Sequence, residues 1–209
     1  MILEACVETW AEAQKARLGG ANRIELCSHL ELDGLTPDEK LIQQTCYGLD
    51  IPVMVMIRPR GGNFVYSVDE LQIMEAEIDM AKDHGASGIV LGLLTPDNKI
   101  DVVNTARLVL RASPLPVTFH KAIDNLIDPV EGVHALKKIQ GITRILTSGG
   151  KPTALEGAEV IRKMIEQAGD NLTILVAGRV TNENVNTIAE LTGATELHGR
   201  KIAGSLLPS

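Results

Sequence analysis

The chain has 209 residues, of which 44% are hydrophobic and 22% charged, with one Trp, two Tyr and two Phe. This composition predicts a globular fold with an aliphatic core and excludes a disordered chain. Asp and Glu total 27 against 20 for Lys and Arg, and the net charge of −7 argues against a nucleic-acid partner. No apolar run approaches the roughly 18 residues of a membrane span, and the acidic N-terminus does not resemble a signal peptide. We therefore expect a soluble, cytoplasmic protein without a membrane partner, whose three cysteines stay reduced.

Eight short apolar runs alternate with longer stretches whose apolar residues recur every three or four positions, which is typical of repeated strand–helix units. The predicted strands are Ile2–Cys6, Arg23–Cys27, Pro52–Ile57, Gly88–Leu91, Pro116–Phe119, Arg144–Thr147, Thr173–Ala177 and Thr195–His198. Their starts lie roughly 21 to 36 residues apart, which leaves room for a crossover helix after each strand.

Local chemistry marks where three of the helices begin. Thr36–Glu39 offers a hydroxyl cap, a proline in the first turn and a returning carboxylate, and Asp128–Glu131 repeats this plan. Ser67–Glu70 has the composition of a capping box.

This alternation, without a linker or low-complexity segment, favours a closed parallel (β/α)8 barrel of the TIM type, a single α/β domain over residues 1–209. An open doubly wound sheet is the alternative. Only Gly199–Ser209 follow the eighth strand, so the last helix is expected to be truncated or missing. A flank of the barrel would then be left for a second copy of the chain to cover, in a homo-oligomer.

Polar residues end the first, second and eighth predicted strands, which become neighbours when a barrel closes. They are Glu4 and Cys6, Glu25 and Cys27, and Glu196 and His198. Because side chains alternate along a strand, each Glu shares a face with the Cys or His two residues later. If that face points inward, three acids lie beneath two thiols and an imidazole.

Cationic, hydroxyl and glycine residues follow four other strands, where a barrel collects its chemistry. Two arginines beside a glycine pair, and a hydroxyl pair followed by glycines, are typical of sites that bind anions. The residues expected to bind a small anion at the barrel mouth are Arg58, Arg60, Lys121, Thr147, Ser148, Gly149, Gly150 and Arg179.

Each of these features also has a purely structural interpretation. Inward carboxylates facing inward arginines can simply neutralise one another, since buried charge persists when it is paired. Cys6 and Cys27 can be small apolar fillers, because free cysteine is among the most buried residues. Gly149 and Gly150 can do no more than turn the chain.

The chain resembles the CutC family, the so-called copper homeostasis proteins, in segments that follow one another along nearly its whole length. The most specific are Met56–Gly62 (Met-Ile-Arg-Pro-Arg-Gly-Gly) and Ile145–Gly149 (Ile-Leu-Thr-Ser-Gly), with Arg23–Cys27, Pro116–His120 and Glu196–His198 beside them. This resemblance implies a (β/α)8 barrel, a cytoplasmic location and a role in copper handling, with oligomers allowed.

The role in copper handling that the resemblance implies leads to one hypothesis for the site. Cys6 and Cys27, with His198 as a third ligand, would hold Cu(I), a soft ion that thiolates match. Neighbouring strands lie about 4.8 Å apart, which allows two thiols to share an ion. Barrel stagger is the obstacle, because it can place His198 too high or too low.

The alternative hypothesis is a barrel enzyme or binder that acts on a small anionic metabolite, phosphorylated ones included. The cations and hydroxyls at the mouth exceed what a plain scaffold needs. Glu4, Glu25 or His120 would then transfer protons, since acids close to one another have raised pKa values.

Overall fold

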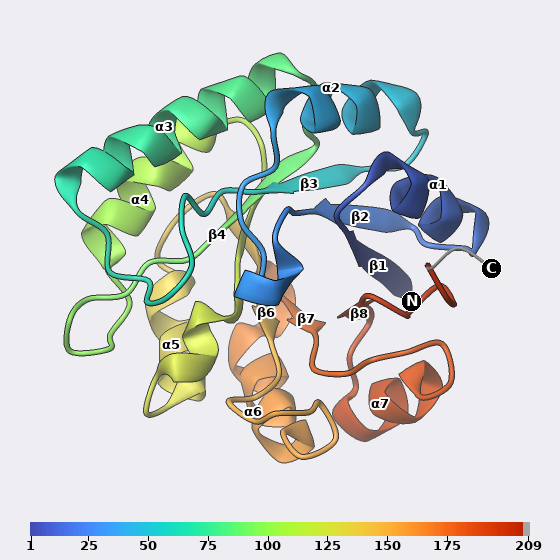
Figure 1. The fold of residues 1–209 in the computed structure, drawn as a ribbon. Helices are drawn as coiled ribbons and strands as arrows, with labels where there is room; N and C mark the ends of the chain where they lie inside the picture. Colours follow the sequence, from blue (N-terminus) through green and yellow to red (C-terminus); the bar gives the residue numbers. More distant parts are fainter. Residues whose placement is uncertain (207–209) are drawn as a thin grey trace.

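Eight parallel strands form one closed barrel in the computed structural model, which describes residues 1–206 (Figure 1). Every predicted strand is present, with its ends within two residues of the expected ones. The strands are β1 (Ile2–Val7), β2 (Arg23–Leu26), β3 (Val53–Met56), β4 (Gly88–Leu91), β5 (Val117–Phe119), β6 (Ile142–Thr147), β7 (Thr173–Val176) and β8 (Glu196–Gly199).

The strands follow one another around the barrel in chain order, and β1 pairs with β8 to close it. This closure excludes the doubly wound alternative. The register sets the heights of the polar residues: Glu4 lies opposite both Arg23 and His198, whereas Cys6 lies opposite Glu25. His198 is therefore level with an acid of β1 and not with the sulfur of β1.

Seven α-helices, counted over residues 1–206, form a ring outside the strands (Figure 1). Short 3₁₀ turns lie in the loops, among them η1 (Leu30–Leu32) and η2 (Lys121–Asn125) near the barrel mouth. No helix in this part of the chain has the length and apolarity that crossing a bilayer requires. The helices are α1 (Trp10–Leu18), α2 (Glu39–Gly48), α3 (Val68–Asp83), α4 (Val102–Ala112), α5 (Pro129–Leu136), α6 (Ala158–Ala168) and α7 (Val185–Thr192).

Two of the three predicted helix starts are confirmed. Ser67 and Glu70 form a reciprocal capping box at α3, and Asp128 caps α5 with a proline in the first turn. The predicted hydroxyl cap at Thr36 is wrong, because Asp38 caps α2 instead. The Thr36 hydroxyl accepts a hydrogen bond from the backbone N–H of Arg58 and donates one to Glu77. It therefore ties the loop after β2 to the loop after β3 and to α3.

No helix follows β8 among residues 200–206, as expected from the short remainder of the chain. This segment packs back on the barrel, with Ile202 and Leu206 buried. The segment is so close to α1 that a Cβ at Gly19 would lie 2.2 Å from the carbonyl oxygen of Ala203. The chain thus covers part of the flank that the missing helix leaves, and the homo-oligomer stays a prediction.

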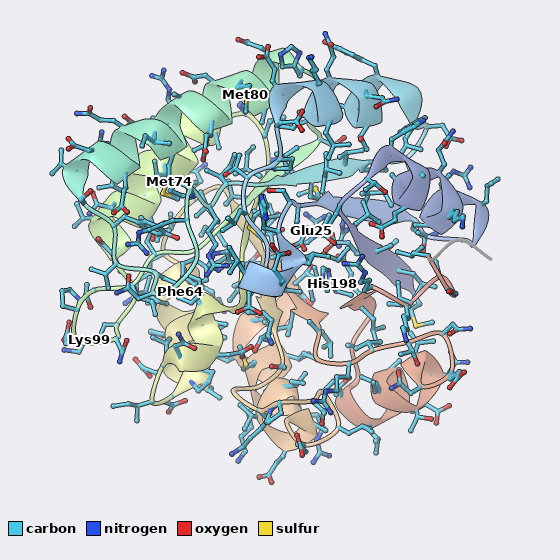
Figure 2. All side chains as sticks on the ribbon, in the orientation of Figure 1. Glu25, Phe64, Met74, Met80, Lys99 and His198 are labelled. Carbon is cyan, nitrogen blue, oxygen red and sulfur yellow. The ribbon has the colours of Figure 1, made fainter. Side chains whose placement is uncertain are left out.

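Side-chain alternation on the first two strands separates two environments. The outward-facing residues of these strands, such as Ala5 and Ile24, belong to the large apolar core between strands and helices. Cys6 and Cys27 belong to a separate small cluster inside the barrel. The labelled Glu25 and His198 also lie near the barrel centre in Figure 2. The interior of this barrel is therefore polar and sulfur-rich along β1, β2 and β8, where branched aliphatic residues are usual.

Candidate functional site

A cavity of about 420 Å³ lies at the mouth of the barrel. Cys6, Glu25 and His198 form one part of its lining, from β1, β2 and β8, while Arg58 and His120 come from the ends of β3 and β5. These residues were expected to meet at one end of the barrel. The cavity brings most of them together, with the exceptions described below.

Two free, buried thiols lie close together here: Cys6 lines the cavity, and Cys27 is fully buried beside it. The Sγ atoms of Cys6 and Cys27 are 3.9 Å apart, and the Cys27 sulfur is 3.4 Å from Oε2 of Glu25. Ligand atoms of these three residues all lie within 4.8 Å of one another. The register explains the cluster, because Cys6 pairs with Glu25 and Cys27 follows two residues later on the same face.

His198 belongs to a second cluster, with Glu4 and Glu25. Its Nδ1 is 2.9 Å from Glu4 and its Nε2 is 3.7 Å from Glu25. The imidazole also helps to lower the pKa of Cys6. The two clusters thus share Glu25, and the stagger between β1 and β8 keeps His198 out of the set formed by Cys6, Glu25 and Cys27.

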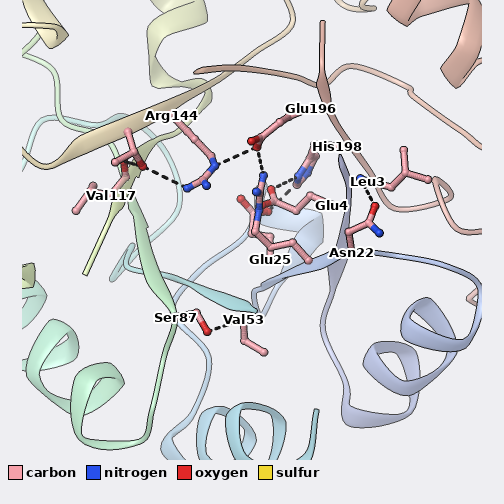
Figure 3. A network of polar contacts seen from close by, with 12 residues as sticks. Leu3, Glu4, Asn22, Glu25, Val53, Ser87, Val117, Arg144, Glu196 and His198 are labelled. Carbon is pink, nitrogen blue, oxygen red and sulfur yellow. Dashed lines mark hydrogen bonds and ion pairs between the residues drawn. The ribbon is translucent and has the colours of Figure 1, made fainter. Parts of the chain in front are cut away.

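Arg23 holds the acids beneath this site, and sequence reasoning gave it no role. Its guanidinium donates to Glu4 and, at 2.5 Å, to Glu196, which also accepts from Arg144 at 3.0 Å (Figure 3). The paired charges match the interpretation that inward acids and arginines neutralise one another. The signal in the sequence was an arginine at the start of a buried strand, and only the register links it to Glu4.

The short distances between these buried ionisable groups shift their pKa values. The hydrogen bond between the sulfurs lowers the pKa of Cys6 to about 5. His198 contributes to this lowering, whereas burial opposes it. The same hydrogen bond raises the pKa of Cys27. Burial, together with the charges of Cys6 and Glu4, raises the pKa of Glu25. Although burial opposes it, the neighbouring carboxylates raise the pKa of His198. These shifts favour a thiolate at Cys6, a thiol at Cys27, a protonated Glu25 and a protonated His198.

Arg58 and His120 form a different part of the wall. The Arg58 guanidinium donates to the carbonyls of Leu32, Gly34 and Gly62, which fixes the loops after β2 and β3. The His120 Nδ1 accepts the N–H of Ala122, and burial with the nearby Arg58 charge lowers the pKa of His120 to about 3. His120 is thus a neutral, fixed hydrogen-bond donor.

The hydroxyls and amides after β6 already have an anionic partner, because Asp124 of η2 occupies them. Its carboxylate accepts from the hydroxyls of Thr147 and Ser148 and from the amides of Ser148 and Gly150. The Gly149 amide donates to Thr147. Sequence reasoning gave Asp124 no role, since nothing in the pattern shows which donors its carboxylate meets.

Of the remaining expected anion-binding residues, Lys121 lines the same cavity as Arg58, whereas Arg60 and Arg179 do not. Arg60 pairs with Glu70 and donates to backbone carbonyls of its own loop. Lys121 lies 3.7 Å from Asp124, at the edge of the cavity. Arg179 has a left-handed backbone and lines a second hollow with Lys121 and His198.

Comparisons with known proteins agree with the barrel fold. Residues 1–203 match the model of the CutC family. The chain is 44% identical over 197 residues to the copper homeostasis protein cutC homolog of Homo sapiens, covering 94% of this chain and 72% of that protein. It is 42% identical over 196 residues to a family protein CutC of Photobacterium profundum, covering 94% and 80%. A crystal structure of a CutC from Streptococcus agalactiae superposes with a TM-score of 0.91 at 35% identity, over 97% of this chain and 99% of that chain. The chain belongs to the CutC family.

Proposed function

We propose that this protein takes part in copper homeostasis in the cytoplasm by binding a Cu(I) ion through the sulfurs of Cys6 and Cys27. Family membership supports the copper role, since the human relative is named a copper homeostasis protein. The observation that carries the proposal is the pair of free, buried thiols with sulfurs 3.9 Å apart.

The spacing of the sulfurs suits a single bridging ion. Thiolates are soft ligands that select Cu(I). With metal–sulfur bonds of about 2.3 Å, as in zinc sites, two sulfurs up to about 4.6 Å apart can share an ion. The 3.9 Å between Cys6 and Cys27 lies inside this limit, so binding needs no rearrangement of β1 and β2.

The charges around the thiols favour a monovalent cation. The lowered pKa of Cys6 favours its thiolate, whereas Cys27, with its raised pKa, has to release its proton when the ion binds. Two thiolates and Cu(I) leave one negative charge, which the imidazolium of His198 balances. The raised pKa of Glu25 favours its neutral form, which adds no charge. Because a proton is released, the affinity rises with pH.

A competition titration tests the proposal. Reduced protein is titrated anaerobically with Cu(I) against a chelator of known affinity. The wild type is expected to bind one ion per chain, and the double variant Cys6→Ser, Cys27→Ser to bind more than about a hundredfold more weakly, since losing even an outer-shell partner costs 10–100-fold.

Cys46→Ser is the matched control. Cys46 lies on α2, away from the cavity wall, and burial raises its pKa to about 11, so its loss should leave the affinity unchanged. Equal Cu(I) affinity in the double variant and the wild type would end the assignment to Cys6 and Cys27.

A further inference from the structure

Arg58 and His120 have hydrogen-bonding capacity that the proposed copper site does not use. Both are buried, with exposed fractions of 2% and 4%, and both line the cavity at the barrel mouth. Within residues 1–206, Nε of Arg58 and Nε2 of His120 are buried polar atoms that lack a hydrogen-bond partner. Leaving a buried donor unpaired is costly, so such atoms call for an explanation.

Both atoms are donors. The N–H of Ala122 points at Nδ1 of His120, at 3.1 Å, so Nδ1 carries the lone pair and the proton of the neutral ring is on Nε2. Nε of Arg58 always carries a hydrogen. The missing partner must therefore supply acceptor atoms.

The missing partner must also supply negative charge. Arg58 forms no ion pair with a carboxylate anywhere in residues 1–206, and its terminal nitrogens bind only neutral backbone carbonyls. A buried charge without a counter-ion is unfavourable. An anion with acceptor oxygens satisfies both requirements.

The two donors are held rigidly. The ring of Phe64 lies 4.9 Å from Cζ of Arg58 and 4.9 Å from the ring of His120. Gly92 leaves the space that the imidazole fills, since a Cβ there would lie 2.3 Å from Nδ1. Groups fixed in this way before a ligand arrives lose little entropy on binding.

We infer that Arg58 and His120 form a binding site for the carboxylate of a small organic acid, with its carbon skeleton against Phe64, Met56 and Leu146. These apolar side chains line the same cavity, and about 420 Å³ is within the usual size of a small-molecule site. A carboxylate presents two oxygens in a plane and one negative charge, which suits one guanidinium N–H and one imidazole N–H.

A phosphate group suits the site less well. The hydroxyls and amides after β6, which could serve its further oxygens, are taken by Asp124. Asp124 also lines the cavity and lies 3.7 Å from Lys121, so it repels a dianion and offsets that lysine. The geometry of the site thus favours a carboxylate over a phosphate.

The test uses copper-free, reduced, full-length protein and sodium acetate, pyruvate, lactate, succinate and inorganic phosphate as probes. The ¹H–¹⁵N signal of His120 Nε2–H is followed during each titration, and affinities are measured by calorimetry. At least one carboxylate is expected to saturate and shift this signal. His120→Asn keeps an acceptor for the Ala122 N–H but removes the donor, and should weaken binding at least about tenfold, as for a hydrogen bond to a charged group.

His134→Asn is the matched control, because His134 is an exposed residue on α5 outside the cavity, and it should bind like the wild type. Failure of every carboxylate to bind below a Kd of about 10 mM, or tighter binding of phosphate than of any carboxylate, would overturn the inference. So would equal binding by His120→Asn. If that variant does not fold, the shift of the wild-type signal decides alone. The variant Cys6→Ser, Cys27→Ser should keep carboxylate binding, so failure of one proposal leaves the other intact.

Discussion

Arg23 is the cation that pairs with the two buried acids beneath the site, Glu4 and Glu196. Its side chain is 7% exposed and lies between Glu4 and Glu196, from the two strands on either side of the β1–β8 seam. Acids this deeply buried persist in a barrel when a cation pairs with them. Within residues 1–206, Cys6 of β1 and Glu25 of β2, which lie opposite each other nearer the mouth, form no ion pair with an arginine. Charge neutralisation by Arg23 therefore accounts for Glu4 and Glu196. It does not account for Cys6 and Glu25 nearer the mouth, which are left for ligand binding.

Replacement of this arginine should strongly destabilise the fold. Arg23→Met leaves Glu4 and Glu196 buried without their shared cation, and we expect a loss of about 3–5 kcal/mol in the free energy of unfolding, measured by urea denaturation. Arg17→Met is the control, since its pair with Asp50 is 41% and 70% exposed and its loss should cost far less stability than that of Arg23. Similar losses in both variants would contradict the role assigned to Arg23.

The 3₁₀ turn η2 and the turn after β6 act as one element, joined by Asp124. The carboxylate fills a pocket of hydroxyls and amides that otherwise has the character of an anion site. Its four partners come from Thr147, Ser148 and Gly150, so η2 is fixed against β6 through a single side chain. His120, at the start of η2, is positioned by the same arrangement.

Removal of this carboxylate should create an anion site. Asp124→Gly leaves the donors of Ser148 and Gly150 unpaired, and we expect a loss of about 2–4 kcal/mol in the free energy of unfolding. Added sulfate should restore part of it and raise the melting temperature of this variant more than that of the wild type.

Asp128→Ala is the control for this experiment. It removes an N-cap of α5, should cost about 1 kcal/mol, and leaves no pocket for sulfate to fill. A melting temperature of Asp124→Gly with no greater sulfate dependence than the wild type would disagree with this account of the turn.

The sequence allowed the strands and the closed barrel to be predicted because both depend on local periodicity and spacing. It also pointed to some of the residues that line the cavity, among them Cys6, Arg58 and His198. It could not show that His198 is level with Glu4, since the stagger of a barrel is a property of all eight strands. Nor could it show that Asp124 meets the turn at Ser148, because that contact joins two loops 24 residues apart, and neither loop has a periodic pattern.

For the whole molecule, two buried acids on the neighbouring strands β1 and β2, Glu4 and Glu25, give the stability of the fold opposite dependences on pH. Although burial opposes it, His198 and Arg23 lower the pKa of Glu4 to about 2, so its contribution is present above its ordinary value of 4.5 and is lost as the pH falls toward 2. Burial raises the pKa of Glu25, so the fold is favoured below 4.5 and loses stability as the pH rises toward the raised value. Glu25 therefore lowers the free energy of unfolding as the pH rises above 4.5.

Glu25→Gln should recover that stability. At neutral pH the wild type must take up a proton at Glu25 on folding, whereas a glutamine is neutral in both states, so the variant is expected to gain stability relative to the wild type between pH 4.5 and pH 7. Urea denaturation of reduced, metal-free protein at several pH values measures the difference. Glu4→Gln is the control with the opposite shift, and its loss should be complete by about pH 5 and constant above it. A difference between Glu25→Gln and wild type that stays constant or shrinks as the pH rises would mean that Glu25 is ionised in the folded barrel, and the charge balance proposed for Cu(I) binding would fail with it.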